Sequence, residues 1–364
     1  MSKNKKLKLI HATGSHLDIG RQIGEACAAQ VRHSIENGHK LIRDAFDDLQ
    51  LNWKGARIQA RKYIPFAEER YPKYVDEMRG IAEGADVKFD DIAVLNVMEG
   101  VVTDALHLSK CTSMAVNQER TVDGSVLVAH NEDWVPEDEP DVFILRVQPD
   151  DEPAFLSMTY GGLLPNIGFN EHGIAQCCDS VTTIDKRIGV PRILVSRAVL
   201  AATTPGEAIS RMLIPQRAAG YNHLLVHESG ELYSVEVSAR NFALLYGSQG
   251  YMVHTNHYLD REMQKIEDEP DELINTRVRY WRAYRLVQQV NQHSIESLQH
   301  IQKDHINFPD SICRHEDKQG ATLEREKTIV SLVIDLTHRQ MHAAWGNPCE
   351  HKHQTFSLDV DPSA

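Results

Sequence analysis

LSKCTSMAVNQERTVDGSVLVAHNEDW, residues 108–134, contains the pattern that decides the fold. Apolar runs lie on both sides of Asp123-Gly124, and an Asp-Gly pair between two such runs is the strongest short-range signal of a β-hairpin. If these two residues form the turn, Cys111 lies opposite roughly residue 136. Asn131–Trp134 then lie at the same end of the hairpin as the cysteine, within roughly 7–17 Å along strands that rise about 3.3 Å per residue. A bulge or bend is needed to close that gap.

The same alternation continues after this hairpin. Turn residues separate four further pairs of apolar runs, which predict hairpins at 142–148/154–160, 222–228/231–237, 242–246/251–255 and 328–336/340–345. Successive hairpins build antiparallel sheets. Helical segments interrupt them at 192–202, 204–213, 271–291 and 294–303. Thr204 is the predicted cap of the second, with Pro205 at the first helical position. Strands in blocks with helices between them predict an α+β fold of two sheets with helices outside.

Residues 1–110 have a helical rather than an alternating pattern. Apolar residues recur near the helical period in the segments 15–46, 56–69, 73–85 and 89–100. Ser15 is placed to cap the first helix, and Gly84 to end the third. We therefore expect a boundary just before Cys111. It divides a helical leading segment, 1–110, from a catalytic chain, 111–364.

Composition excludes several classes of function. The chain has 364 residues, of which 41% are hydrophobic and 25% charged, enough for one large domain or two of ordinary size. A net charge of −13 disfavours nucleic acid as a partner, because an acidic surface repels phosphates. No run approaches the roughly 18 apolar residues of a membrane span. The six cysteines are scattered except for Cys177-Cys178, which is not a secreted disulfide framework, so we expect a cytoplasmic protein with reduced thiols.

The histidines and cysteines do not predict a metal site or a cofactor. His254 and His257 lie three residues apart in a predicted strand, which puts them on opposite faces. No His-x-x-x-His or Cys-x-x-Cys spacing falls on a predicted helix. The vicinal pair Cys177-Cys178 bridges only with strained geometry, so core packing is its expected role. Gly161-Gly162 predicts a tight turn near the pocket, and Tyr160 before it either lines that pocket or packs as a strand aromatic.

Cys111 has two interpretations. As a nucleophile it needs a base, because a free thiol titrates near pH 8.5. Cleavage of the preceding peptide bond would supply its own α-amine, with a pKa of about 7.7–8.0, as that base. Asp133 could then hold the amine, and an asparagine N–H could stabilise the oxyanion, a contact worth about 3 kcal/mol of barrier. Alternatively, Cys111 is a small buried hydrophobe and Asn131–Asp133 caps a turn.

The segment CTSMAV…DGSVLVAHNEDW resembles the start of the mature chain in cysteine N-terminal-nucleophile (Ntn) hydrolases. The branch that it resembles most is the acyl-CoA:6-aminopenicillanate (isopenicillin N) acyltransferase family. GGLLPNIGFNEHGIA, MVHTNHY and DSICRHEDKQGATL agree in order, and GSHLDIGRQIGEA and EMRGIAEGADVKFDDIAVLN are similar to that family's leading segment. The resemblance spans most of the chain, and it implies a four-layer αββα sandwich.

The resemblance also implies roles for individual residues. Cys111 matches the nucleophile, which is freed by autocatalytic cleavage between Lys110 and Cys111. Asp133 matches the acid of the N-x-D element, which in the family lies beside the nucleophile, and Asn131 belongs to the same element. Asn256, in HTNH, matches the asparagine expected to donate to the oxyanion. Asn170 falls in a matched turn, where a structural role and a functional one are both open.

Three positions depart from the penicillin enzyme that the chain resembles. Lys110 stands in place of Gly, and Lys318-Gln319 in place of Ser-Arg. His130 occupies a position that bile-salt-hydrolase relatives fill with Arg and the penicillin enzyme with Gln. The resemblance therefore carries the chemistry over to this chain but not the specificity for penicillin.

The sequence thus predicts a self-processing hydrolase of a linear amide, with a small-molecule amide or acyl-CoA as substrate. Acyl transfer to an amine acceptor is the first alternative. A catalytically silent binding protein is the second, and the matched trio of Cys111, Asp133 and Asn256 argues against it. The leading segment is expected to stay bound after cleavage, since it would otherwise expose apolar faces. Whether the protein forms a homo-oligomer is left open.

Overall fold

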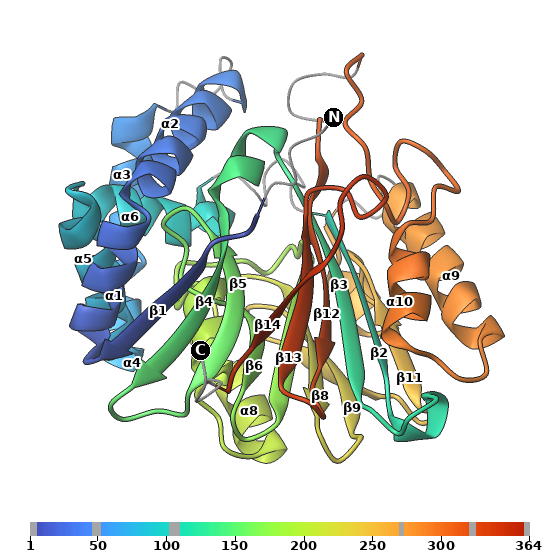
Figure 1. The fold of residues 1–364 in the computed structure, drawn as a ribbon. Helices are drawn as coiled ribbons and strands as arrows, with labels where there is room; N and C mark the ends of the chain where they lie inside the picture. Colours follow the sequence, from blue (N-terminus) through green and yellow to red (C-terminus); the bar gives the residue numbers. More distant parts are fainter. Residues whose placement is uncertain (1–5, 46–51, 102–109, 269–272, 320–324, 360–364) are drawn as a thin grey trace.

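The computed structural model describes residues 6–45, 52–101, 110–268, 273–319 and 325–359, and within them the strands form two sheets (Figure 1). One sheet has the order β1-β4-β5-β6-β7-β8-β9-β10. Its strands are β1 Leu9–Gly14, β4 Val142–Pro149, β5 Phe155–Tyr160, β6 Ile167–Asn170, β7 Ile174–Ser180, β8 Tyr221–His227, β9 Leu232–Val237 and β10 Phe242–Tyr246. The other has the order β11-β2-β3-β12-β13-β14. Its strands are β11 Tyr251–His254, β2 Lys110–Val116, β3 Leu127–Trp134, β12 Lys327–Asp335, β13 Gln340–Trp345 and β14 Gln354–Ser357.

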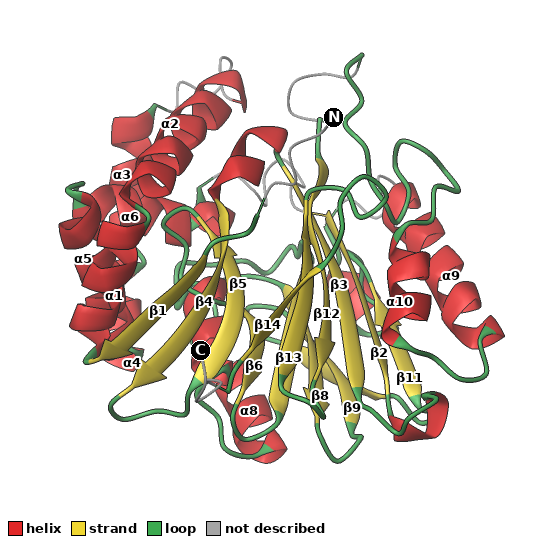
Figure 2. Ribbon diagram, viewed as in Figure 1, coloured by secondary structure: helices red, strands yellow, loops and turns green. Residues whose placement is uncertain are grey.

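Helices cover the outer faces of both sheets (Figure 2). Those that precede β2 are α1 His16–Ala26, α2 Ala28–Ala45, α3 Trp53–Arg61, α4 Ile64–Arg70, α5 Pro72–Ala85 and α6 Phe89–Asn96. Later in the chain come α7 Arg192–Val199, α8 Pro205–Met212, α9 Ile274–Gln289 and α10 Ile295–Gln302. The 3₁₀ turns are η1 Met98–Gly100, η2 Gln118–Arg120, η3 Pro136–Asp141 and η4 Met263–Ile266. Among the described residues, no helix combines the length and the apolar character needed to cross a bilayer.

The layers stack as helix, sheet, sheet, helix. Helices α1, α2 and α8 contact the eight-stranded sheet, while α9 and α10 contact β2, β3, β11 and β12 of the six-stranded sheet. Strands β2 and β3 in turn contact β7 and β8 across the interface between the sheets. The predicted α+β class and the four-layer αββα sandwich are therefore confirmed.

Most of the predicted elements are present, with local differences in the helices. Ser15 caps α1 by accepting a hydrogen bond from the backbone N–H of Asp18, and Thr204 caps α8 in the same way from Glu207. The long helix predicted at 15–46 is interrupted at Cys27. Gly84 is not a C-cap: α5 continues to Ala85, and Asp86, in the left-handed region with a φ of +54°, is the cap. Gly84 instead allows α1 to approach, because a Cβ there would lie 2.1 Å from the backbone oxygen of Arg21. The two helices pack through glycines instead.

The hairpin predicted at 242–255 is wrong. Strand β10 pairs with β9 in the eight-stranded sheet, whereas β11 pairs with β2 in the six-stranded sheet. Residues 247–250 therefore carry the chain from one sheet to the other. This crossing places His254 and the residues after it beside the strand that begins at Lys110, which no local pattern indicates.

The leading segment contributes a strand that the sequence analysis did not predict. β1 pairs in parallel with β4, which makes it the edge of the eight-stranded sheet. Apolar side chains of α1 and α5, such as Ile23 and Met78, belong to the same buried cluster as Ile144 and Leu145 of β4. The leading segment is thus built into the core of the sandwich.

The register of the β2–β3 hairpin differs from the prediction. Asp123-Gly124 does turn, since Asp123 accepts a hydrogen bond from Ser125 N–H and Gly124 has a φ of +78°. However, β2 ends at Val116 and β3 begins at Leu127, so the connection is longer than two residues. Cys111 consequently pairs with Glu132 rather than with residue 136, and no bulge is needed to bring the two ends together.

Candidate active site

Strands β2 and β3 place two sets of polar side chains on opposite faces of one sheet, because strand side chains alternate. Cys111 pairs with Glu132, and Ser113 with His130, so these four project together toward the eight-stranded sheet. Thr112, Asn131 and Asp133 project from the other face, toward α9 and α10. Both faces are covered, and every residue of β3 is buried.

The backbone of Cys111 is held at both ends. Its N–H donates a 2.8 Å hydrogen bond to Oδ1 of Asn256, whose Nδ2 donates to the carbonyl oxygen of Ser180 at 3.0 Å. Its carbonyl oxygen accepts a 2.5 Å hydrogen bond from Nη1 of Arg279, and Nη2 of the same guanidinium donates to Asn256 Oδ1 at 2.8 Å. Asn256 thus lies beside Cys111, as the family resemblance implied, and its role as an oxyanion donor stays a prediction. Arg279, on α9, was missed.

The thiol of Cys111 lies in an acidic, dry environment. Its side chain is about 1% exposed, and Sγ lies 3.5 Å from Oε2 of Glu132. Burial raises the pKa of the thiol well above its ordinary value, and the negative charges of Glu132, Asp179 and Asp133 raise it further. In the uncleaved chain, the cysteine is therefore a protonated thiol.

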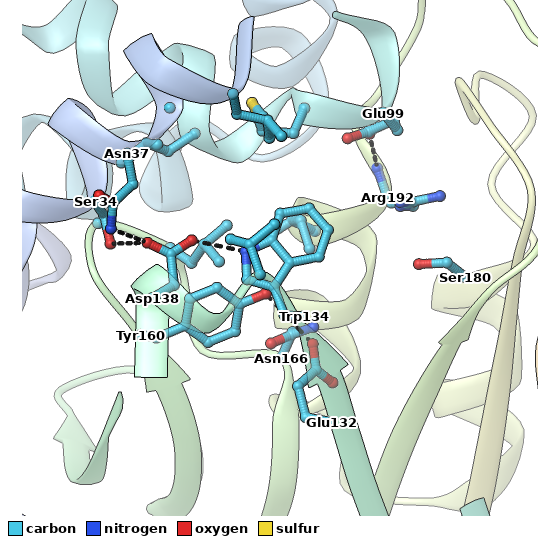
Figure 3. Close-up of a pocket in the computed structure, with 18 of the residues that line it drawn as sticks. Ser34, Asn37, Glu99, Glu132, Trp134, Asp138, Tyr160, Asn166, Ser180 and Arg192 are labelled. Atoms are coloured by element: carbon cyan, nitrogen blue, oxygen red, sulfur yellow. Dashed lines mark hydrogen bonds between the residues drawn. The ribbon is translucent and has the colours of Figure 1, made fainter. Parts of the chain in front are cut away.

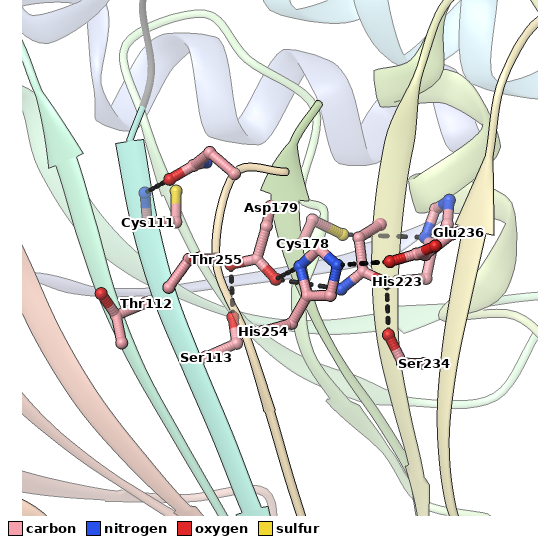
Figure 4. Close-up of polar contacts among 12 residues, drawn as sticks. Cys111, Thr112, Ser113, Cys178, Asp179, His223, Ser234, Glu236, His254 and Thr255 are labelled. Carbon is pink, nitrogen blue, oxygen red and sulfur yellow. Dashed lines mark hydrogen bonds and ion pairs between the residues drawn. The ribbon is translucent and has the colours of Figure 1, made fainter. Parts of the chain in front are cut away.

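A chain of buried polar side chains leads from Glu132 across the interface between the sheets, and Figure 4 shows its part from Ser113 to Glu236. Its contacts follow one another from β3 to β9: Glu132 Oε2–His130 Nε2 at 2.9 Å, His130 Nδ1–Ser113 Oγ at 2.9 Å, Ser113 Oγ–Asp179 Oδ1 at 2.7 Å, Asp179 Oδ2–His254 Nδ1 at 3.2 Å and His254 Nε2–Glu236 Oε1 at 3.0 Å. Burial lowers the pKa of His254, but hydrogen bonds with Asp179 and Glu236 outweigh it and raise the pKa to about 9. A buried cation between two carboxylates ties the sheets together behind Cys111.

Asp133 lies on the opposite face from the thiol. Its Oδ1 accepts a 2.6 Å hydrogen bond from Thr328 Oγ1, and its Oδ2 has no hydrogen-bond partner among the described residues. Burial raises the pKa of Asp133 to about 7, although the charges of Arg279 and Arg314 and the Thr328 hydrogen bond act to lower it. Asp133 is the strand partner of Lys110, the residue before Cys111.

Asn131 and Asn170 hold backbone groups rather than the reacting centre. Asn131 Nδ2 donates to the carbonyl oxygens of Gln302 and Ile312, at 3.1 and 2.8 Å. Asn170 makes four hydrogen bonds, all of them to backbone groups. Their partners are the carbonyls of Leu200 and Ala202 and the N–H groups of His172 and Ile174. These contacts favour the structural alternative for Asn170.

A cavity opens beside Glu132 (Figure 3). Tyr160 lines it and donates a 3.3 Å hydrogen bond to Oε1 of Glu132. Of the two predicted roles of this tyrosine, the structure thus shows the one in the pocket lining. Asp138 lines the polar side, held by Asn37 Nδ2 at 2.8 Å and Trp134 Nε1 at 2.7 Å. Burial raises the pKa of Asp138 to about 6.

The leading segment forms one wall of this cavity. It contributes residues from α2, α6 and η1, namely Ser34, Asn37, Gly38, Leu41, Leu95, Met98 and Glu99. Across the cavity, Ser180 of β7 lies next to Asn256, whose Nδ2 donates to the Ser180 carbonyl. The cavity therefore extends from the helices of the leading segment to the neighbours of Cys111, namely Glu132 and Ser180.

The fold and this arrangement around an N-terminal-nucleophile-like cysteine agree with the comparison to known families. Residues 119–350 match the model of the family described as acyl-coenzyme A:6-aminopenicillanic acid acyl-transferase, which is more than half of the chain. The chain belongs to this family. The matched region includes Asp133 and Asn256, and it begins shortly after Cys111.

Two relatives extend the comparison. The chain is 25% identical over 348 residues to the acyl-coenzyme A:6-aminopenicillanic-acid-acyltransferase 40 kDa form of Emericella nidulans, covering 93% of both chains. It is 23% identical over 228 residues to the β-alanyl-dopamine/carcinine hydrolase of Drosophila melanogaster, covering 57% of each.

Solved structures give weaker matches. The penicillin V acylase of Agrobacterium tumefaciens superposes with a TM-score of 0.45 and 14% identity, over 65% of this chain and 83% of that one. A conjugated bile acid hydrolase of Clostridium perfringens gives a TM-score of 0.44 and 11% identity, over 70% of this chain and all of that one.

Proposed function

We propose that the chain is a self-activating cysteine Ntn hydrolase that cleaves a linear amide through an acyl-enzyme on Cys111. The observation that carries the proposal is the grip on Cys111, whose N–H is held by Asn256 and whose carbonyl is held by Arg279 beside a cavity. Every buried backbone group needs a partner, but here two side chains replace a neighbouring strand, because the pairing of β2 with β11 ends at Ser113. A residue whose own nitrogen has to act as a base needs such a grip on its backbone.

Activation is cleavage of the peptide bond between Lys110 and Cys111. The new α-amine of Cys111 would remain within hydrogen-bond reach of Asn256 Oδ1, which already accepts the amide N–H at 2.8 Å. We assign Asp133 as the carboxylate that stabilises the protonated amine. Support comes from its position as the strand partner of Lys110 and from its Oδ2, which has no hydrogen-bond partner among the described residues.

In the catalytic cycle, the amine takes the thiol proton and Sγ attacks the carbonyl carbon of the substrate amide. The C–N bond then breaks, the α-ammonium returns a proton to the leaving amine, and a thioester remains. Water, deprotonated by the same amine, cleaves the thioester to a carboxylic acid and the free thiol. We assign Asn256 Nδ2 as an oxyanion donor, because it already faces a carbonyl oxygen, that of Ser180, at the cavity.

The cavity suggests how a substrate is held. Its apolar side chains include Leu41, Leu95 and Met98 of the leading segment, while Glu132, Asp138 and Tyr160 form a polar side. A substrate with an apolar portion and a hydrogen-bonding portion fits such a lining. We propose that His130 orients the carboxylate of Glu132, which its Nε2 contacts at 2.9 Å.

Acyl transfer is the alternative function, favoured by the family description and by the name of the Emericella relative. The Drosophila relative is named as a hydrolase, so its name favours hydrolysis. An amine acceptor that replaced water, or an acyl-CoA donor that replaced the amide, would use the same thioester. Measuring how products partition with and without added amines distinguishes the two, and exclusive amide synthesis from acyl-CoA would contradict hydrolysis.

We further propose that the leading segment stays bound after cleavage. Strand β1, the buried pair of Glu77 and Arg197, and the cavity wall all join it to the remainder of the chain. Size-exclusion chromatography followed by a denaturing gel tests this. Both fragments are expected in one peak, and loss of the small fragment would contradict it.

The experiment that tests the main proposal is intact mass under denaturing conditions on wild type and Cys111→Ala. Wild type should give two fragments split between Lys110 and Cys111, whereas the variant should stay whole. A panel of linear amides is then assayed with cleaved protein. A single full-length mass in both proteins, together with no labelling of Cys111 by a thiol-reactive probe, would favour the catalytically silent binding protein instead.

A further inference from the structure

Four metal-binding side chains converge at a place away from the cavity. They are His305, Cys313, His315 and Cys349, and one ligand atom of each lies within 4.8 Å of the others. The first three lie in the segment that follows α10, and the fourth in the turn that follows β13. Two segments that are distant in the sequence thus meet at a cluster of two thiols and two imidazoles.

The separations match the edges of a tetrahedron around one ion. His305 Nε2 and His315 Nε2 are 3.1 Å apart, and the two sulfur atoms are 3.6 Å apart. His315 Nε2 lies 3.6 Å from Cys313 Sγ and 3.4 Å from Cys349 Sγ. Zinc bonds of about 2.0–2.1 Å to nitrogen and 2.3 Å to sulfur give tetrahedral edges of about 3.3–3.8 Å. The two remaining separations, from His305 to the sulfur atoms, are within 4.8 Å, so a shift of the His305 side chain toward the two sulfur atoms completes the site.

We propose that these four residues form a Cys₂His₂ site for Zn²⁺. Two thiolates with two imidazoles in tetrahedral arrangement select zinc over the hard cations, which prefer oxygen ligands. Cys313 is buried while His305 and Cys349 are exposed, so an ion can enter from solvent. With four protein ligands the site is closed, which makes it structural rather than catalytic.

Groups around the ligands support metal binding. Nδ2 of Asn347 donates to Sγ of Cys313 at 3.6 Å, a contact that stabilises a thiolate. The Nδ1 side of His315 faces the carboxylate of Glu350 at 4.0 Å, which suits an imidazole that binds a metal through Nε2.

A disulfide between Cys313 and Cys349 is the competing explanation. It accounts for the two sulfur atoms but not for the convergence of both imidazole Nε2 atoms on the same point. Ligand spacings within single helices or strands predicted no metal site. Here three ligands come from one irregular segment and the fourth from 34 residues further on, so no spacing rule applied.

The site lies next to residues that position Asp133. Arg314, between two of the ligands, donates its backbone N–H to Thr328 Oγ1 at 3.0 Å, and that hydroxyl donates to Asp133 Oδ1 at 2.6 Å. The carbonyl of Ile312 accepts the 2.8 Å hydrogen bond from Asn131. Zinc would therefore fix segment 312–315 against the outer face of the strand that carries Asp133.

Metal analysis of the full-length chain, purified without added metal and without chelator, tests the proposal. One zinc ion per chain is expected by elemental mass spectrometry. Replacement by Co²⁺ should give the intense visible bands of a tetrahedral ion and a thiolate charge-transfer band. His305→Ala and Cys349→Ser, both at exposed positions, should each weaken zinc binding by more than the roughly 10- to 100-fold loss typical of an outer-sphere change. His338→Ala is the matched control for a histidine outside the cluster.

Three results would overturn the proposal. One is wild-type protein that binds neither zinc nor Co²⁺ in a competition assay with a coloured chelator. Another is an intact mass lower by two hydrogens, with Cys313 and Cys349 linked in the peptide map. The third is zinc affinity unchanged in Cys349→Ser that is folded by circular dichroism. Because the cobalt spectrum is recorded on wild type, the test does not depend on the variants folding, and it is independent of the enzymatic activity.

Discussion

Arg279 donates a 2.5 Å hydrogen bond to the carbonyl oxygen of Cys111 from a helix more than 160 residues further along the chain. The same guanidinium also donates to Asn256 Oδ1 and to Thr112 Oγ1, and its Nε donates to Asn275. Arg279 is about 1% exposed, and burial lowers its pKa. The outer helix layer therefore controls where the backbone of Cys111 lies.

Arg279→Lys should slow self-cleavage and substrate turnover by about 10- to 100-fold, because an ammonium cannot reproduce the planar fork that serves several acceptors at once. The charge is retained, so the fold should persist. The rate at which the two fragments appear, followed by mass spectrometry, is the measurement. Arg285→Lys, at an exposed position on the same helix, is the control. Equal processing rates in both variants would show that Arg279 does not position Cys111.

Asp133→Asn should change how stability depends on pH, measured in the Cys111→Ala background so that the chain stays whole. Burial raises the pKa of Asp133 from 3.8 to about 7, so folding favours the protonated acid. The stability that it contributes is complete below pH 4 and is lost as the pH rises toward 7. The amount lost is on the order of 2–4 kcal/mol. The Asn variant does not lose stability in this way. The unfolding temperature of the variant minus that of the parent should therefore be larger at pH 8 than at pH 4.5.

In processed wild type the same exchange has a second consequence. If Asp133 stabilises the ammonium of Cys111, Asp133→Asn should lower turnover at every pH and shift the pH profile, because the pKa of the amine falls when the carboxylate is removed. An unchanged pH profile would restrict Asp133 to a structural role.

Glu132→Gln should make the thiol of Cys111 more reactive. The negative charge of Glu132 contributes, after burial, to the raised pKa of the thiol, so its removal lowers that pKa. Each unit by which the pKa falls raises the thiolate fraction, and hence the rate of alkylation by iodoacetamide at pH 8, about tenfold. Tyr160→Phe removes only the 3.3 Å hydrogen bond to Glu132 and is the matched control. A slower reaction in Glu132→Gln would be contrary to this account.

Glu77→Ala should destabilise the protein by about 3–5 kcal/mol, because it leaves a buried guanidinium without one of its carboxylates. Glu77 lies in the leading segment and holds Arg197 through contacts of 2.6 and 3.0 Å, with both side chains almost fully buried. Chemical unfolding of the Cys111→Ala chain measures the loss. Arg79→Ala, which removes exposed ion pairs on the same helix, should change stability by less than about 1 kcal/mol.

The local architecture was predictable because its signals are local. Period-two alternation and turn residues gave the hairpins β2–β3, β4–β5, β8–β9 and β12–β13, and the caps Ser15 and Thr204 were correct. The Asp-Gly turn was also correct, but the register was four residues off. The register depends on which residues of β3 pair with β2. Burial of both faces of β3 in the folded protein sets that pairing.

The site divides in the same way. The motif around Cys111, Asn131 and Asp133 was visible in the sequence, and Asn256 was found only through the resemblance to a known family. Arg279 and the buried chain to His254 had no signal, because they depend on contacts between segments that are far apart in the sequence. Glu132 was missed because the predicted hairpin register placed residue 136 opposite Cys111. The sequence also placed Asp133 near Cys111 but could not say that their side chains project from opposite faces.

The sequence by itself determined that a hairpin of two apolar runs begins at about Cys111, because hydrophobic periodicity and turn chemistry act between neighbours. Only the tertiary structure decided which side chains meet Cys111. That outcome required β11 to cross to the second sheet, α9 to cover its outer face and the leading segment to complete the cavity. The free energy gained by burying apolar surface between the four layers selects those pairings. Segments from the whole chain contribute to it, so no single stretch of sequence predicts it.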